Sequence, residues 1–235
     1  MSTISKKVPA LIGLIAAAAT AFMTFACKPI DPENPEETVY VFFTGNIYVQ
    51  GGSGTDLEFN VQADSITSPV LTGSFSIGHD RGDFTVQMPG EAAEPAVYTM
   101  DGDTSHCTQV LSDGSCSASS TAWQRGLVYG LQITDAGIEG ASPSGSDPLV
   151  WQVTRSTDES GTETFSGMIV STTGDLPVSV EIDSEGTVYG QITYRGKTLV
   201  MNGYTSLDEA PDLGNVPQGA IVSLLLASAL HVGSL

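Results

Sequence analysis

The chain has 235 residues, and its 27 acidic side chains outnumber the 8 basic ones, which gives a formal net charge of −19. A surface this acidic repels phosphate backbones, so the composition excludes nucleic acid as a partner. Because 40% of the residues are hydrophobic and only 15% are charged, the composition also excludes a disordered acidic tail. The length predicts a single folded domain, or at most two small ones.

Residues 1–26 have the polarity of an export signal. Lys6 and Lys7 form a short positive segment, and an uncharged stretch follows from Val8 to Phe25. A secretory signal needs this order, because its cations stay in the cytoplasm while its apolar helix engages the translocon. The alternative is a transmembrane helix that is never cleaved, since about 18 apolar residues can just cross a bilayer. We expect cleavage, because the alanine-rich stretch is weakly apolar and contains Pro9.

The end of this segment, Thr24-Phe25-Ala26-Cys27, resembles the lipobox of bacterial lipoproteins. In that family the signal peptide is cut before the cysteine, whose thiol receives diacylglycerol and whose new amine is usually acylated. The resemblance implies that Cys27 carries the lipid, although Thr24 and Phe25 replace the family's usual Leu and small residue. Two or three acyl chains on one residue give stable anchoring to a membrane. The alternative is ordinary cleavage after Ala26, which leaves Cys27 unmodified.

The segment after the lipidation site supports an anchor. Residues 27–37 contain three prolines and four acids and almost no apolar side chain, so they form an extended, solvated tether. Some lipoproteins that stay in the inner membrane have Asp directly after the lipidated cysteine. Because Lys28 occupies that position here, the resemblance favours the outer membrane, with the domain periplasmic or exposed at the surface.

Two cysteines remain for the body of the protein, Cys107 and Cys116. They bracket the turn-forming pair Asp113-Gly114, and an exported protein favours their oxidation, so we predict a disulfide. Such a bridge would stabilise the fold by about 2–3 kcal/mol in the chain-entropy model. Metal binding with the adjacent His106 is the alternative, but the spacing lacks the paired ligands of a zinc site.

Residues 38–206 predict a single all-β domain. Apolar and polar residues alternate in about ten short stretches, which indicates an antiparallel sandwich or barrel. In the stretch 39–49, one face of the strand would carry Val39, Val41, Phe43 and later apolar residues. The opposite face would carry Tyr40, Phe42 and Tyr48. That second face is either core or an exposed surface for stacking a carbohydrate or peptide, and we favour core. Residues 135–147 predict a long loop within the domain, because they are rich in Gly, Ser and Pro. The stretches that alternate lie at or near residues 39–49, 57–63, 71–77, 84–88, 96–100, 127–134, 149–154, 165–171, 178–182, 188–194 and 198–204.

Glycines recur on the predicted inner faces of these strands. Two copies of the pattern are Phe43-Thr-Gly45-Asn-Ile47 and Leu71-Thr-Gly73-Ser-Phe75, and looser copies surround Gly167 and Gly190. A missing side chain permits sharp bending or close approach of another layer, which favours a closed or strongly coiled sheet. The alternative is coincidence in a chain with 26 glycines.

Residues 207–235 predict a linker and a short C-terminal apolar helix. Pro217 suits a helix start, and the following Ala- and Leu-rich segment breaks the strand pattern. A helix that is apolar nearly all round must be buried or lie in lipid, so we expect it to pack on the β-domain or rest at the membrane surface. The alternative is a eukaryotic GPI-attachment tail that is removed from the mature protein.

Candidate sites in the body are weak. Arg81-Gly82-Asp83 matches the tripeptide that integrins recognise, but turns favour these residues in any case. Acidic clusters near Asp101, Asp158 and Asp183 contain ligands suited to calcium, without a complete EF-hand pattern. There is no Gly-x-Ser-x-Gly nucleophile motif, and the three histidines suggest no general base. The sequence therefore predicts no catalytic residue, no metal ligand and no cofactor.

These observations favour an exported, lipid-anchored β-domain with a structural or binding role in the cell envelope. Its partners are the membrane, through the anchor, and an unidentified cell-surface carbohydrate or protein. One alternative is a hydrolase of polysaccharide or peptidoglycan on a β-sandwich, which requires two carboxylates about 5–10 Å apart in a cleft. The other is a calcium-dependent surface adhesion module, which requires three or more converging acidic side chains.

Overall fold

The computed structural model describes residues 39–62, 69–90, 96–113, 115–120, 130–141, 148–205 and 217–234. These residues form thirteen β-strands and one C-terminal α-helix. The elements are β1 (Val39–Val49), β2 (Gly54–Gln62), β3 (Val70–Ile77), β4 (Asp80–Gln87), β5 (Tyr98–Val110), β6 (Cys116–Ser120), β7 (Gly130–Thr134), β8 (Gly137–Ala141), β9 (Val150–Thr157), β10 (Glu163–Ser171), β11 (Gly174–Ile182), β12 (Thr187–Tyr194), β13 (Lys197–Thr205) and α1 (Gln218–Ser234).

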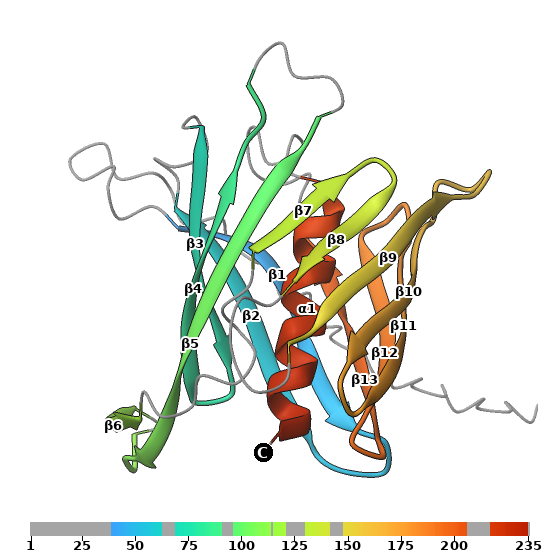
Figure 1. Cartoon of the computed structure of the whole chain (residues 1–235). Helices are drawn as coiled ribbons and strands as arrows, with labels where there is room; N and C mark the ends of the chain where they lie inside the picture. Colours follow the sequence, from blue (N-terminus) through green and yellow to red (C-terminus); the bar gives the residue numbers. More distant parts are fainter. Residues whose placement is uncertain are drawn as a thin grey trace, which may run out of the picture.

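The strands form a closed antiparallel barrel (Figure 1). Nearly every strand pairs with its neighbour in the chain, and the last strand, β13, pairs with β1 to complete the wall. Twelve strands make the barrel, while β6 pairs only with the end of β5 and forms a hairpin outside it. The predicted all-β antiparallel class is therefore confirmed, and the choice between sandwich and barrel is resolved as a barrel. The expectation of about ten strands was too low.

Helix α1 lies inside this barrel, so its position differs from the prediction. It runs along the lumen (Figure 1), and all its residues except those near its two ends are buried. A barrel of eight strands is filled by its own side chains, whereas sixteen strands leave a channel. Twelve strands leave room for a helix of about 10 Å diameter. A helix apolar on every side is stable here because the wall surrounds it, and it forms part of the core instead of a removable tail.

Inward-facing glycines make room for the aromatic side chains around the helix. A Cβ atom on Gly203 or Gly45 would overlap the ring of Phe43, and one on Gly73 would overlap the ring of Phe84. The rings therefore lie against the wall over these glycines, and the centre of the barrel stays free for α1. This packing explains why the inward-facing glycines occur in a closed sheet: they permit the close approach that the aromatic rings require.

A β-bulge corrects the predicted faces of the first strand. The pairing of β1 with β2 shifts register between Val41 and Phe43, so Phe42 and Phe43 are both fully buried. Beyond the bulge the alternation continues as predicted, with Gly45 and Ile47 facing inward. Before it the faces exchange, because an extra residue reverses the side on which each side chain lies. Val39 and Val41 are consequently exposed, whereas Tyr40 packs against the core, as favoured for its face.

Two expectations about loops also need correction. The stretch 135–147 is not one loop, because β8 occupies part of it and pairs with both β7 and β9. The strand expected near 96–100 continues to Val110, since β5 first pairs with β4 and then forms the hairpin with β6. Period-two alternation did not indicate these strands, because β8 is short and glycine-rich and the end of β5 has no buried face.

Candidate functional site on the outer wall

The outer wall carries a polar groove over β2, β3 and β4. It has a volume of about 340 Å³ and is open to solvent along one side. Its side chains stand in two rows across the three strands. Glu58, Ser76 and Arg81 are paired in the first row, and Asn60, Ser74 and Asp83 in the second.

The groove exists because the middle strand has small side chains. Ser74 and Ser76 of β3 form its floor, while longer side chains of β2 and β4 form its two walls. In β2, β3 and β4 the side chains that alternate with these polar groups are buried, so the polar groups face outward. Phe75, between the two serines, is 2% exposed and packs edge-on against Phe59 in the core.

The groups in the groove offer both kinds of hydrogen-bonding partner. Arg81 supplies donors only, the carboxylates of Glu58 and Asp83 are acceptors, and the serine hydroxyls serve as either. The walls are partly ordered by internal contacts: the amide Nδ2 of Asn60 donates to Oε1 of Glu58 at 2.7 Å. Nη1 of Arg81 donates to the carbonyl oxygens of Gly78 and Asp80, each at 2.8 Å.

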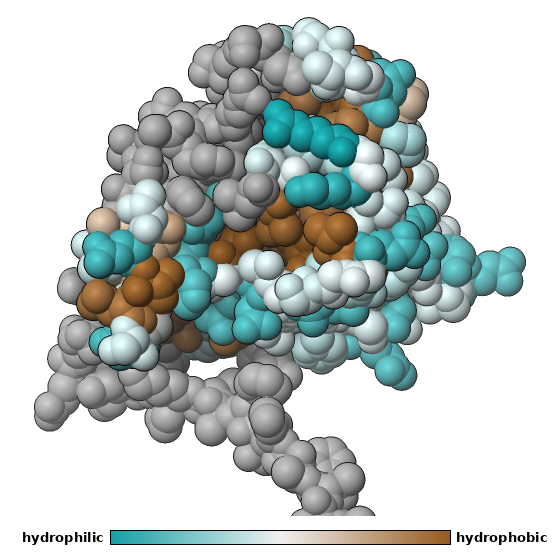
Figure 2. Space-filling model, turned by 90° about the horizontal axis from the view of Figure 1, so that it is seen from below, coloured by the Kyte–Doolittle hydropathy of each residue, from teal (hydrophilic) through white to brown (hydrophobic). Residues whose placement is uncertain are grey.

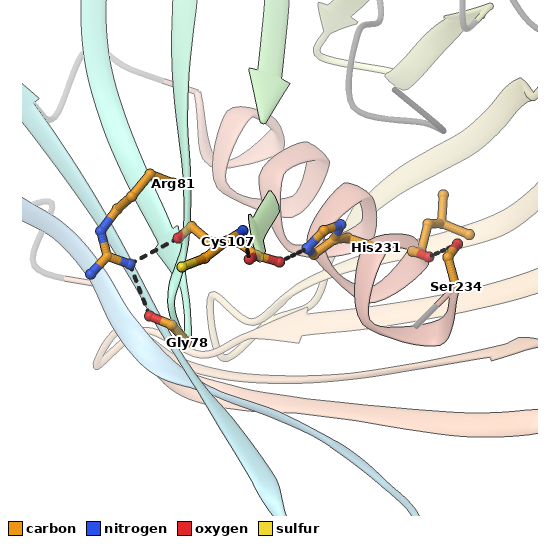
Figure 3. A network of polar contacts seen from close by, with 7 residues as sticks. Gly78, Arg81, Cys107, His231 and Ser234 are labelled. Carbon is orange, nitrogen blue, oxygen red and sulfur yellow. Dashed lines mark hydrogen bonds and ion pairs between the residues drawn. The ribbon is translucent and has the colours of Figure 1, made fainter. Parts of the chain in front are cut away.

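Directly behind Arg81, a buried polar pair joins the wall to the helix (Figure 3). The Asp80 side chain faces inward, where its Oδ2 forms a hydrogen bond with Nε2 of His231 near the end of α1. Its Oδ1 accepts a hydrogen bond of 2.8 Å from the backbone N–H of Cys107. Asp80 and His231 are 5% and 0% exposed, and they are the buried ionisable residues among those that the structure describes. One carboxylate therefore connects the helix, strand β4 and the root of the β5–β6 hairpin.

This pair does not make a catalytic site. Ser228 precedes His231 by one helical turn, so the three residue types of a serine hydrolase triad occur close together in the lumen. All three side chains are buried, and no substrate could reach them while α1 fills the barrel. The role of Asp80 and His231 is structural, because a buried carboxylate or imidazole without its partner would be strongly destabilising.

The structure places Arg81-Gly82-Asp83 within a strand. The tripeptide lies near the start of β4, paired with both β3 and β5, and not at the tip of a hairpin. Arg81 and Asp83 project from the same outer face of β4 and belong to the groove, while Gly82 between them has no side chain to contribute. An integrin-type site needs an exposed turn, so the resemblance to that motif has no structural basis here. The same two side chains instead become candidates for binding within the groove.

Two of the three acidic clusters form hydrogen-bonded turns at the ends of hairpins, whereas Asp101 lies within strand β5 and pairs with Thr85 of β4. Oδ1 of Asp158 accepts hydrogen bonds from Ser160 and Thr162, and the Ser160 hydroxyl contributes most to lowering the pKa of Asp158. Oδ1 of Asp183 likewise accepts from Glu185 and Thr187, and the Thr187 N–H is the main cause of its lowered pKa. Within the described part of the chain, no three His, Cys, Asp or Glu residues are grouped to hold a metal ion.

An ion pair links the upper ends of β9 and β10. Arg155 contacts Glu163 through two hydrogen bonds of 2.7 Å, and Asp135 lies 3.5 Å from the same guanidinium. The hydrogen bonds that Arg155 donates to Glu163 raise the pKa of Arg155 above its usual value. Arg155 is therefore fully engaged in holding a hairpin, and it is not available to a ligand.

The predicted disulfide is confirmed, since Cys107 and Cys116 are bonded to each other across the β5–β6 hairpin. Cys27, the predicted lipidation site, lies outside the described residues, as do the signal segment and the tether. The side chain of His106, the alternative metal ligand, is also outside them. His79 is an exposed turn residue, and of the two histidine side chains that the structure describes, His231 has a partner that sequence reasoning missed.

Comparisons with known proteins identify no relative. No protein-family model, curated protein or solved structure matches the chain. Among the described residues, no helix combines the length and the hydropathy needed to cross a bilayer.

Proposed function

We propose that this protein is a lipid-anchored envelope protein whose barrel binds a hydroxyl-rich glycan strand in the groove over β2, β3 and β4. The observation that carries this proposal is the groove itself, where hydrogen-bonding side chains of β2 and β4 flank a floor of serines on β3. Helix α1 occupies the barrel's lumen and is buried along nearly its whole length. The groove offers a ligand site on the outside of the wall.

The chemistry of the groove suits sugar hydroxyls, which both donate and accept hydrogen bonds. Glu58 and Asp83 can accept from hydroxyl groups on opposite sides, and Arg81 can donate to ring or hydroxyl oxygens between them. Because Nη1 of Arg81 is already held by two carbonyl groups, binding would cost little side-chain entropy there. The groove is open, so a polymer could pass through it without its chain end entering a pocket.

Anchoring rests on the sequence resemblance to bacterial lipoproteins at Cys27. A domain held by a tether at the membrane is well placed to contact envelope glycans repeatedly, because tethering raises their effective concentration. The test is fractionation of cells that express the full chain or its Cys27→Ser variant. We expect the wild type in the membrane fraction and the variant released from it, and detergent partitioning that is the same for both would refute the anchor.

The glycan proposal is tested by co-sedimentation of the Cys27→Ser protein with insoluble peptidoglycan. Arg81→Gln and Asp83→Asn each remove one groove contact and should weaken binding at least about tenfold. Gln191→Ala, on the exposed face of β12 at the other side of the barrel, is the matched control and should bind like the parent. Equal binding by all four proteins, or none by the parent, would contradict the proposal.

Hydrolysis is a second candidate, because the same groove contains two carboxylates. Glu58 and Asp83 lie two strands apart and two residues out of register, which separates their Cα atoms by about 12 Å. Side chains of this length can approach to the separation that inverting glycosidases use, with room for a water molecule. Release of soluble fragments from peptidoglycan that Glu58→Gln abolishes would support an enzyme. Binding without release would support a binding protein.

A further inference from the structure

Two features of unlike chemistry lie on opposite sides of the barrel's lower rim, the end where α1 terminates. One is the β5–β6 hairpin, which extends below the wall, and the other is the turn between β12 and β13 (Figure 1). The hairpin presents apolar residues with an acid, and the turn presents two cations beside an apolar surface. Their arrangement is what suggests a partner.

The hairpin is a rigid projection with an apolar end. The last pair between β4 and β5 joins Arg81 to Ser105, and beyond it β5 pairs only with β6. Val110 and Leu111 are 43% and 45% exposed, and Asp113 follows them in a turn closed by hydrogen bonds to Ser115. The disulfide crosses the hairpin, and Asp80 holds its root at Cys107. We call residues 110–113 the tip.

The opposite side of the rim combines cations with apolar side chains. The guanidinium of Arg195 lies over the ring of Tyr194, 5.1 Å from its centroid. Tyr194 and Lys197 are directly opposite each other, so both side chains leave the face of the sheet that looks into the lumen. Val49 and Val232, with Tyr194, are only partly buried against the core. We call these five residues the basic mouth, and Figure 2 shows apolar residues in the opening within a hydrophilic rim.

The cations of the basic mouth are unusual for so acidic a protein. Arg195 and Lys197 form no ion pair with any described residue, although the chain has a net charge of −19 and Asp175 lies at the start of β11, the strand next to β12. Among the residues that the structure describes, Arg195 is the one non-glycine residue with a positive φ, which is 51°. Asparagine or glycine would adopt this conformation at lower cost, so an exposed arginine here points to a role outside the fold.

We propose that the basic mouth binds the tip of a second copy of this chain. Val110 and Leu111 would cover the partly exposed valines of the mouth, and Asp113 would approach the two cations. Because tip and mouth lie on opposite sides of one rim, a two-fold axis through the middle of the lower end brings each tip onto the other copy's mouth. The contact forms twice, closes on itself and leaves both grooves accessible on the outer walls.

The point where β1 begins agrees with this arrangement. Strand β1 begins at the end of the barrel opposite the hairpin (Figure 1), so the lower end faces away from the point where the chain enters the domain. The net negative charge of the two copies opposes their association. At physiological ionic strength the screening length is about 8 Å, so distant carboxylates are screened while the contacts between tip and mouth persist.

The test is sedimentation velocity of the Cys27→Ser protein in physiological salt at about 1–100 μM, a range that resolves a micromolar dimer. The parent should shift from monomer to dimer across this range. Leu111→Ser at the tip and Lys197→Glu at the mouth should each raise the dimer dissociation constant about tenfold or more. Ser156→Glu, which adds an acid to the exposed face of β9 near its upper end, is the charge control and should leave the constant unchanged.

A charge exchange makes the test specific. Ser112→Lys puts a cation on the tip and should weaken the dimer, while combining it with Lys197→Glu should restore association to within about threefold of the parent. A monomer at every concentration, or a dimer that Leu111→Ser and the exchange leave unchanged, would overturn the proposal. A lower Tm of Lys197→Glu with unchanged association would also overturn the proposal. The cations would then act only by stabilising the C-terminal end of α1, where the carbonyl groups give a partial negative charge.

Discussion

Asp80 and Arg81 are neighbours on strand β4, but they lie on opposite faces of the barrel wall: Asp80 on the buried inner face and Arg81 on the outer face that contacts solvent. Asp80 faces the lumen, where each oxygen of its buried carboxylate has a named partner. Its neighbour Arg81 faces solvent and belongs to a groove whose floor is made of small side chains. The lumen side thus contributes stability, while the outer side can change its chemistry at little cost to the fold.

The largest expected effect comes from breaking the buried pair. Asp80→Leu removes the partner of His231 and the acceptor of the Cys107 N–H, and should lower the free energy of unfolding by about 3–5 kcal/mol. Chemical denaturation of the variant and the parent measures this directly. Asp80→Leu combined with His231→Leu should recover part of the loss, since the unpaired imidazole is removed and the Cys107 N–H is the group that still lacks its acceptor. A double variant as unstable as the sum of both single changes would contradict a pairing role.

The next effect concerns packing of the helix. Leu225 is fully buried in the middle of α1, so Leu225→Ala should cost about 2–5 kcal/mol through lost burial and a residual cavity. Gln152→Ala, on the exposed face of β9, should change the free energy of unfolding by no more than about 0.5 kcal/mol. If both substitutions cost the same, α1 would not be the core of the barrel.

The sequence predicted the lumen side better than the outer side. Period-two alternation and the inward glycines such as Gly45 and Gly73 indicated an antiparallel, closed or coiled sheet, and the uniformly apolar C-terminus indicated a helix that is either packed on the domain or at the membrane surface. The location of this helix inside the barrel was not predictable, because the hydrophobic pattern of a helix does not show which surface covers it. The bulge beside Phe42 escaped detection for a similar reason, since one inserted residue leaves the local composition unchanged.

The outer site was missed because it depends on register. Glu58, Ser76 and Arg81 are far apart in the chain, and each looks like an ordinary solvent-facing residue of a strand. Only the pairing of β2, β3 and β4 puts them in one row. The pair of Asp80 and His231 was missed likewise, although an acid on an inward position and a histidine in an apolar helix are the signals that could have suggested it.

A smaller loss of stability is expected from opening the hairpin that carries the disulfide. Cys107→Ser combined with Cys116→Ser should lower the free energy of unfolding by about 2–3 kcal/mol, because the unfolded chain regains the freedom of a short loop. Hydrogen exchange should increase in β6 and at the hairpin root, and much less in β9 to β12. Equal acceleration throughout the barrel would show that the hairpin is not a separate unit.

The smallest effect should appear in acid, at the hairpin turns of Asp158 and Asp183. Their pKa values in the folded protein lie below the usual 3.8, so their contribution to stability is present above that pH and is lost as the pH falls through the lowered values. Asp158→Asn and Asp183→Asn keep an acceptor oxygen but do not titrate there. The double variant should show a shallower decline of Tm in acid than the parent, and parallel curves would contradict this assignment.

The contrast between the two sides is tested most directly by measuring Tm and peptidoglycan affinity on one pair of variants. Asp83→Asn changes the groove and Leu225→Ala changes the lumen, both in the Cys27→Ser protein. We predict that Asp83→Asn weakens binding about tenfold or more at nearly unchanged Tm, and that Leu225→Ala lowers Tm with unchanged affinity in the temperature range where it remains folded. Weaker binding by Leu225→Ala with full binding by Asp83→Asn would contradict a ligand site on the outer wall.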